Sequence, residues 1–168
     1  MSNVADAVKA LRAVRSFRED PLSDADLTAV LEAGRWTGSA KNLQDWAFIV
    51  ITSPDQKDRL AACGSFMDPV RNAPAAIAIV EEPGGYEFDS GRVAQNMMLA
   101  AAAIGVATCP VTVHDDAAAR PVLGLSDDQR CRYAIAIGYP AEGLRPPSRK
   151  GGGRKPLDEL VHHDRYGG

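Results

Sequence analysis

The chain alternates between apolar positions spaced for helices and continuous apolar runs. Spacings of three and four residues predict an amphipathic helix over residues 4–14, with apolar positions at Val4, Ala7, Val8, Leu11 and Val14. This helix would deliver Arg15, Ser16 and Arg18 at or just past its end. A second helix is predicted from Ser23, which with Asp26 resembles a capping box, to a closing Gly34.

Continuous apolar runs predict the strands. Residues 46–52 form such a run, as expected for a strand buried on both faces, and residues 75–80 and 131–138 form two more. Residues 107–113 are different, because Pro110 has no N–H to donate to a neighbouring strand. They are therefore predicted to form an edge strand or an irregular one.

Further helices are predicted over residues 54–64, 89–104 and 115–123, and the apolar residues of 157–161 permit a last short helix or strand. Pro and Gly mark residues 140–153 as a loop or extended arm. No internal repeat or linker divides the chain. We therefore expect one domain over residues 1–168, with a mixed sheet flanked by helices.

Composition narrows the class of protein. A formal net charge of −3 over 168 residues argues against general nucleic-acid binding. The chain has no run of about 18 apolar residues and no secretory signal at its start, so we expect a cytoplasmic protein that does not cross a membrane. Three unpaired cysteines and the adjacent His162 and His163 suggest neither a disulfide framework nor a metal site.

Two basic segments and a polar loop carry the candidate chemistry. Arg15 and Arg18 flank Ser16 near the start, and Arg154 and Lys155 lie near the end. Guanidinium groups bind phosphate in two places at once. The polar side chains of the loop can contact the nitrogens and carbonyls of a heterocycle, and they are Ser39, Lys41, Asn42 and Gln44. The three segments together suit a phosphorylated redox cofactor, most simply FMN. A solvated helix end and a flexible solvated tail are the alternative interpretations of the basic segments.

These stretches also carry a resemblance. The chain contains Arg15-Ser16-x-Arg18, then Ser39-x-x-Asn42-x-Gln44-x-Trp46-x-Phe48, and later Gly138-Tyr139-Pro140 before Arg154-Lys155-Pro156-Leu157. Between them lies Asp89-x-Gly91-x-x-x-Gln95-Asn96-Met97-x-Leu99-Ala100-Ala101. In order and content this resembles the nitroreductase family of FMN-dependent oxidoreductases, over essentially the whole chain.

The resemblance implies an α+β three-layer sandwich with a mixed, mainly antiparallel sheet, and an interlocked homodimer with FMN at the interface. Arg15 and Ser16 would hold the phosphate and ribityl chain, and Arg18 would approach the pyrimidine end. Further site residues would be Ser39 and Asn42 from the other subunit, Gln44 in the same loop, the backbone of Pro110, Val111 and Thr112 at the flavin N5 and O4 edge, and Arg154 and Lys155 over the phosphate. The chain departs from the family pattern at Val14, Gly38, Ala40 and Asp45.

The function implied is transfer of hydride from NADH or NADPH to FMN and of electrons to a nitroaromatic, quinone or similar acceptor, with no side chain forming a covalent bond. The departures leave the acceptor open. A non-catalytic protein that binds or sequesters flavin is one alternative. Another is an RNA-binding protein that uses the basic arm of residues 145–155, which the acidic net charge disfavours.

Overall fold

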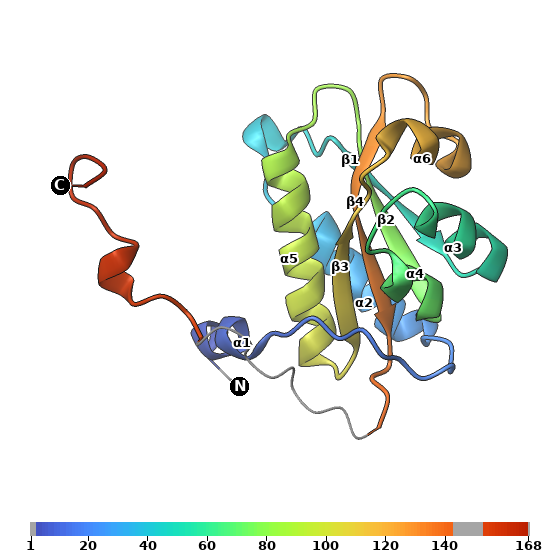
Figure 1. Cartoon of the computed structure of the whole chain (residues 1–168), viewed down its shortest axis with the longest axis horizontal. Helices are drawn as coiled ribbons and strands as arrows, with labels where there is room; N and C mark the ends of the chain where they lie inside the picture. Colours follow the sequence, from blue (N-terminus) through green and yellow to red (C-terminus); the bar gives the residue numbers. More distant parts are fainter. Residues whose placement is uncertain (1–2, 143–152, 168) are drawn as a thin grey trace.

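The computed structural model describes residues 3–142 and 153–167, and its centre is one four-stranded sheet (Figure 1). The strands are β1 (Trp46–Ile51), β2 (Ala75–Glu81), β3 (Ala107–Thr112) and β4 (Arg130–Gly138), in the spatial order β1-β2-β4-β3. Every neighbouring pair is antiparallel. The expectation of a mixed sheet is thus corrected for the part of the chain that the structure describes.

Helices cover both faces of the sheet, which gives the predicted three layers. Helices α2 (Asp24–Arg35) and α5 (Glu87–Ala103) pack on one face. The other face carries α3 (Pro54–Ala61), α4 (Asp68–Asn72) and α6 (Asp116–Leu123). The sequence did not predict α4. The predicted cap at Ser23 is confirmed, because its hydroxyl accepts the backbone N–H of Asp26. The hydroxyl of Ser53 likewise accepts the N–H of Gln56 at the start of α3, where the sequence predicted a helix.

The two central strands divide their side chains by size. Isoleucines of β2 and β4 face α2 and α5, and they are Ile77, Ile79, Ile135 and Ile137. Alanines at the alternate positions face α3, α4 and α6, and they are Ala76, Ala78, Ala134 and Ala136. Because successive strand residues point to opposite faces, each of these strands presents large side chains on one face of the sheet and small side chains on the other. The small side chains let the three short helices lie close to the sheet.

The first helix is shorter than predicted. Helix α1 spans Val4–Ala10, and the chain is extended from there to Arg18. The N–H of Val14 donates to the carbonyl of Thr108 at 2.8 Å, and Phe17 forms a β-bridge with Pro140. Hydrogen bonds to the open edge of β3 and to the end of β4 thus outweigh the helical periodicity of residues 11–14.

Two further expectations are corrected. Strand β1 lies at an edge of the sheet and is mostly half-buried, not buried on both faces. Gly34 does not close α2, which continues to Arg35. A Cβ at Gly34 would lie 3.1 Å from the ring of Phe48 and closer still to Met97, so glycine lets α2 pack closely against α5 and β1 without displacing the Met97 side chain.

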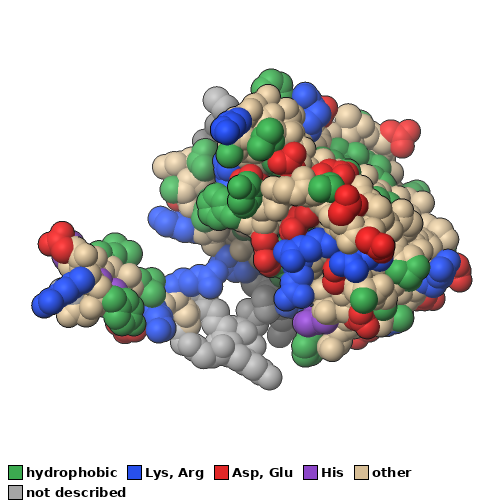
Figure 2. All heavy atoms as spheres, turned by 90° about the horizontal axis from the view of Figure 1, so that it is seen from above, with side chains coloured by type: hydrophobic (Ala, Val, Ile, Leu, Met, Phe, Trp, Pro, Cys, Tyr) green, Lys and Arg blue, Asp and Glu red, His purple; other side chains and the backbone are tan. Residues whose placement is uncertain are grey.

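A C-terminal tail, residues 153–167, stands away from the body of the molecule (Figure 1). All of it is exposed, including a 3-10 turn at Leu157–Glu159. Figure 2 shows hydrophobic side chains on its surface beside charged ones. Three basic residues of the predicted arm, Arg145, Arg149 and Lys150, lie outside the described residues. Each helix within the described ranges is too short or too polar to cross a membrane.

Candidate functional site

A cavity of about 310 Å³ lies against β3. This strand lies at an edge of the sheet, as the presence of Pro110 predicted. The walls of the cavity include Arg15, Phe66 and His114, together with residues 109–112 of the strand. Arg15 and Pro110 are far apart in the sequence. The extended segment after α1 brings them together, because it runs alongside β3 through the hydrogen bond between Val14 and Thr108.

The backbone of β3 turns polar groups toward this open edge. Val113 donates its N–H to Arg132 on the β4 side, and Thr108 accepts from Val14 on the opposite side. Main-chain groups alternate between the two sides along an antiparallel strand. Thr108, Pro110 and Thr112 therefore face the open edge. Pro110 occupies a position where no ladder hydrogen bond is lost, and the N–H of Thr112 is a backbone donor on the side where the cavity lies.

Arg15 supplies the positive charge of the cavity. Cys109, also in the cavity wall, is buried, and this burial raises the pKa of its thiol, while the charge of Arg15 acts in the opposite direction. A guanidinium beside a row of backbone groups is suited to an anionic ligand that also carries hydrogen-bonding edges.

Arg18 does not line the cavity with Arg15, although a helix would have placed the two side chains on one face. Arg18 pairs with Asp20 at 3.0 Å and lies over the ring of Tyr139, 5.0 Å from its centroid. Tyr139 in turn donates its hydroxyl to Asp26, which lowers the pKa of that carboxyl.

Ser16, between the two arginines, is tied to the end of β4. Its carbonyl accepts the N–H of Ala141 at 3.2 Å. Together with the Phe17–Pro140 bridge, this contact fixes the backbone from which Arg15 extends.

The polar loop of residues 37–45 has a constrained backbone. Lys41, Asn42 and Gln44 have φ angles of 51°, 57° and 57°, a region that non-glycine residues seldom adopt. The hydroxyl of Ser39 accepts the N–H of Gln44 at 2.9 Å. Such strain is concentrated at functional positions.

Two side chains of α5 anchor the same loop. Arg92 donates to the carbonyl of Gly38 at 2.7 Å, and Asn96 donates to the hydroxyl of Thr37 at 2.8 Å. The loop is thus held in one shape by α5, and its polar side chains do not line the cavity at Arg15.

The structure therefore brings together part of the predicted site. Arg15 meets Pro110, Val111 and Thr112 at one cavity. Arg154 and Lys155 are exposed residues of the C-terminal tail and do not line this cavity.

Phe66 and His114 are cavity residues that the sequence did not reveal. Phe66 belongs to the loop between α3 and α4, and His114 is the second residue after the end of β3. The only sequence signal was an aromatic residue close to Gly64, and this does not indicate a site by itself.

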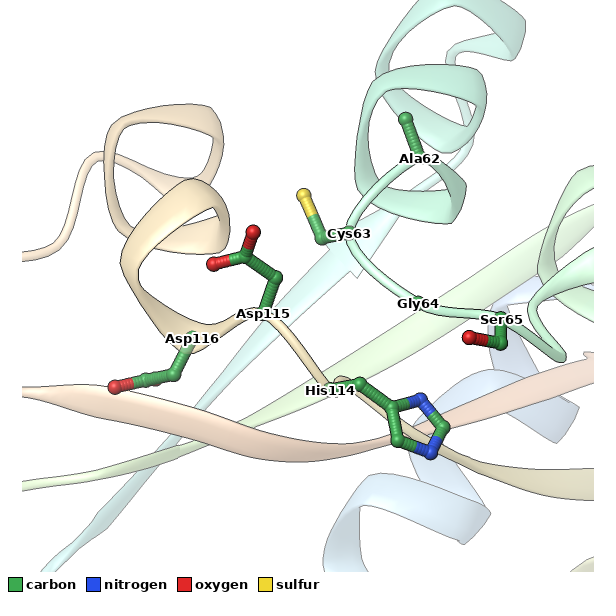
Figure 3. Close-up of a pocket in the computed structure, with 7 residues that line it drawn as sticks. All are labelled: Ala62, Cys63, Gly64, Ser65, His114, Asp115 and Asp116. Carbon is green, nitrogen blue, oxygen red and sulfur yellow. The ribbon is translucent and has the colours of Figure 1, made fainter.

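A second hollow, of about 510 Å³, adjoins the first at His114 (Figure 3). Its walls include Ser65, Asp115 and Asp116. Both carboxylates have partners: Asp115 accepts the N–H of Ala118 at 2.9 Å, and Asp116 pairs with Arg120 at 2.8 Å. Among the described residues, no three His, Cys, Asp or Glu side chains are grouped to hold a metal ion.

Comparisons with known proteins agree with this architecture. The Nitroreductase family profile matches residues 8–83 and 66–139. The chain is 26% identical to an NADH dehydrogenase of Thermus thermophilus, over 89% of this chain and 90% of that protein. It is 24% identical to an NADPH-flavin oxidoreductase of Vibrio harveyi, over 99% of this chain and 75% of that protein.

Among solved structures, a Desulfovibrio desulfuricans protein described as a nitroreductase in complex with FMN superposes with a TM-score of 0.84. It is 28% identical, and the superposition covers 98% of each chain. The family profile extends over most of the sequence, including Arg15 and the β3 residues of the cavity. The chain belongs to the nitroreductase family.

Proposed function

We propose that this protein is an FMN-dependent oxidoreductase that oxidises NADH or NADPH and reduces a nitroaromatic, a quinone or a similar electrophile. The observation that carries the proposal is the cavity at which Arg15 meets the outward-facing backbone of β3. Membership of the nitroreductase family supports it, as do similar proteins named NADH dehydrogenase and NADPH-flavin oxidoreductase.

The residues of the cavity fit FMN. Arg15 at one end suits the phosphate, which carries about −1.5 to −2 charges at neutral pH. The outward N–H of Thr112 suits the polar edge of the flavin ring. When bound, FMN accepts hydride at N5 from the nicotinamide and returns the electrons to a second substrate. The protein supplies position and charge. The role that the resemblance assigns to Arg18, near the pyrimidine end, stays a proposal, because in a single chain Arg18 pairs with Asp20 and does not line the cavity.

We further propose that two copies form a homodimer that completes the site. The cavity of one chain, about 310 Å³, is at the lower end of the roughly 300–1,000 Å³ typical of ligand pockets. Ser39, Asn42 and Gln44 do not line it, and the tail that carries Arg154 and Lys155 projects from the body. A second copy can bring both segments to the cavity. It would also cover exposed apolar residues of the tail.

The absorbance spectrum of the purified protein tests the cofactor. We expect a yellow protein that releases FMN on denaturation, and bleaching of the bound flavin when NADH or NADPH is added without oxygen. Re-oxidation by a quinone should restore the colour. A colourless protein with no thermal shift on adding FMN would overturn the proposal. Bound flavin that neither nicotinamide reduces would instead support a non-catalytic flavin binder.

A pair of arginine variants tests the geometry. Arg15→Ala should weaken FMN binding about 10- to 100-fold, because a charge-assisted hydrogen bond contributes roughly 1.5–3 kcal/mol. Arg12→Ala is the matched control, since the Arg12 side chain donates to the carbonyls of Lys9 and Leu11 at 2.6 and 2.7 Å, and Arg12 does not line the cavity. Equal FMN affinity of the two variants, measured by fluorescence titration, would show that Arg15 does not bind the phosphate.

A further inference from the structure

The polar loop of residues 37–45 adopts an unfavourable backbone shape at an exposed tip. Lys41, Asn42 and Gln44 all have positive φ angles, and all three are exposed. Exposed side chains gain little from burial, so the tip itself does not offset the cost of this backbone. Besides the hydrogen bond between Gln44 and Ser39, the contacts that keep the loop in shape lie at its two ends.

Arg92 of α5 holds the first end of the loop. Its guanidinium donates to the carbonyl of Gly38 at 2.7 Å and pairs with Asp89 at 3.1 Å. It also lies over the ring of Phe88, 5.7 Å from the centroid. Glycine suits this contact, because a Cβ at Gly38 would lie 3.3 Å from Nη2 of Arg92. The three partners fix the guanidinium against the backbone of the loop.

A second side chain of α5 and the turn before this helix hold the rest of the loop. Asn96 donates to the hydroxyl of the buried Thr37 at 2.8 Å. At the far end of the loop, the carbonyl of Asp45 accepts the N–H of Glu82 at 3.2 Å. Both ends of the loop are therefore attached to residues 82–96, and the loop lies beside the first turns of α5 (Figure 1).

The start of α5 is itself fixed to the sheet. Glu81, the last residue of β2, is buried, and both of its carboxylate oxygens have partners. Ser90 of α5 donates to one oxygen at 3.0 Å, and Arg130 of β4 pairs with the other at 2.8 Å. Losing a partner of a buried charge is costly, so this network resists displacement of the first turns of the helix. Arg92 thus links the strained loop to a helix that is held in place.

We propose that Arg92 is a positioning residue that acts across the dimer: it holds Gly38 so that the polar tip of the loop contacts the FMN bound to a second copy of the chain. This inference rests on the proposed function and on the proposed homodimer. In a single chain the tip does not line the cavity at Arg15. Because the loop already has a fixed shape, less conformational freedom is lost when it contacts the cofactor.

Fluorescence titration of the dimer with FMN tests this role. Arg92→Met should weaken FMN binding about tenfold, the effect of losing one charge-assisted hydrogen bond. Arg92→Lys keeps a charged donor and should recover most of the affinity. Asn96→Ala removes the neighbouring anchor and should also weaken binding, so it tests the loop if Arg92→Met does not fold. Arg71→Met is the matched control and should keep full affinity, because Arg71 pairs with Asp68 three residues earlier at 2.9 Å and is similarly exposed in α4.

A mixed dimer shows whether Arg92 acts on the other subunit. Chains with Arg15→Ala and chains with Arg92→Met are co-expressed with different tags, and the dimer that carries both tags is purified. If the loop serves the other subunit, one site contains both substitutions and the other contains neither. The titration should then show one site with the affinity of the unsubstituted protein. If Arg92→Met merely damaged the fold of its own chain, no such site would exist.

Two results would overturn the inference. One is an FMN affinity of Arg92→Met, shown by a thermal melt to be folded, that equals that of Arg71→Met. The other is a mixed dimer in which both sites are weakened, because Arg92 would then act within its own chain. Failure of the proposed function is different, since the unsubstituted protein would then hold no FMN, or NAD(P)H would not bleach it.

Discussion

Burial keeps the thiols of this protein protonated. It raises the pKa of Cys63 and Cys109, and it raises that of Cys131 from 9.0 to about 12. A raised pKa in the folded state adds stability that is fully present below the unfolded value. That stability is lost as the pH rises toward the folded value. For Cys131 the relevant window is therefore pH 9 to about 12.

Cys131→Ala should reveal how the ionisation of this thiol changes the stability of the protein with pH. Between pH 8 and 10.5 the free energy of unfolding of the unsubstituted protein should fall relative to that of the variant, by about 1.4 kcal/mol for each pH unit above 9. The unfolded thiol ionises in this range while the folded one does not. Urea denaturation under reducing conditions measures the difference, and a gap that does not change with pH would contradict it.

Lys57 should change the free energy of unfolding with pH in the opposite direction to Cys131. Its side chain is 7% exposed and its ammonium donates to the carbonyl of Ala73, while burial lowers its pKa below the usual 10.5. The charged form is thus disfavoured in the folded state, and that cost is relieved as the pH rises through the lowered pKa toward 10.5. Relative to Lys57→Met, the unsubstituted protein should gain stability toward high pH. Lys9→Met, at an exposed position in α1, should show no such trend in the same urea titrations.

Glycines at two contacts between secondary-structure elements differ in what surrounds them. A Cβ at Gly138, the last residue of β4, would lie 2.5 and 2.6 Å from the ring carbons of Pro74 and 3.2 Å from Phe17. The proline ring cannot move aside. A Cβ at Gly34 would instead meet mainly the end of the flexible Met97 side chain.

Gly138→Ala should therefore destabilise the protein by about 1–3 kcal/mol, as overpacking does. It should also weaken FMN binding, because a shift of Phe17 would displace Arg15, two residues earlier in the same segment. Gly34→Ala should cost less, since Met97 can rearrange and alanine has a helix propensity about 1 kcal/mol better than glycine. Chemical denaturation and FMN titration of both variants check that Gly138→Ala is the more harmful substitution. An equal loss of stability in the two variants would refute this prediction.

Sequence patterns predicted the elements whose partners are local or whose burial is uniform. The apolar runs of β2 and β4, the cap at Ser23, the start of α3 at Pro54 and the edge position of β3 from Pro110 were all confirmed. The prediction of a helix over residues 11–14 was wrong, because their helical spacing competes with a hydrogen bond from Val14 to a strand far along the chain. The meeting of Phe66 with His114 was equally invisible, since it depends on how two loops pack.

The tail is the feature of the molecule that a single chain does not explain. Residues 153–167 are all exposed, and Leu157, Leu160 and Tyr166 are 74%, 57% and 92% exposed. Apolar side chains gathered in one projecting segment are costly in water and are typical of a surface that another molecule covers. The same segment carries Arg154 and Lys155, which the resemblance assigns to the FMN phosphate. The homodimer proposed above would account for both observations.

Replacing Leu157 and Leu160 together by serine tests this interpretation. If the tail stays in solvent, the double variant should match the unsubstituted protein, because both side chains are largely exposed in one chain. If the tail packs on a second copy, the double variant should dissociate to monomers that remain folded. Its FMN affinity should then fall about tenfold or more, because Arg154 and Lys155 no longer reach the cofactor. Light scattering coupled to gel filtration gives the mass, and fluorescence titration gives the affinity. Asp158→Asn in the same turn should leave both unchanged, and a double variant that stays dimeric with full affinity would exclude the tail from the interface.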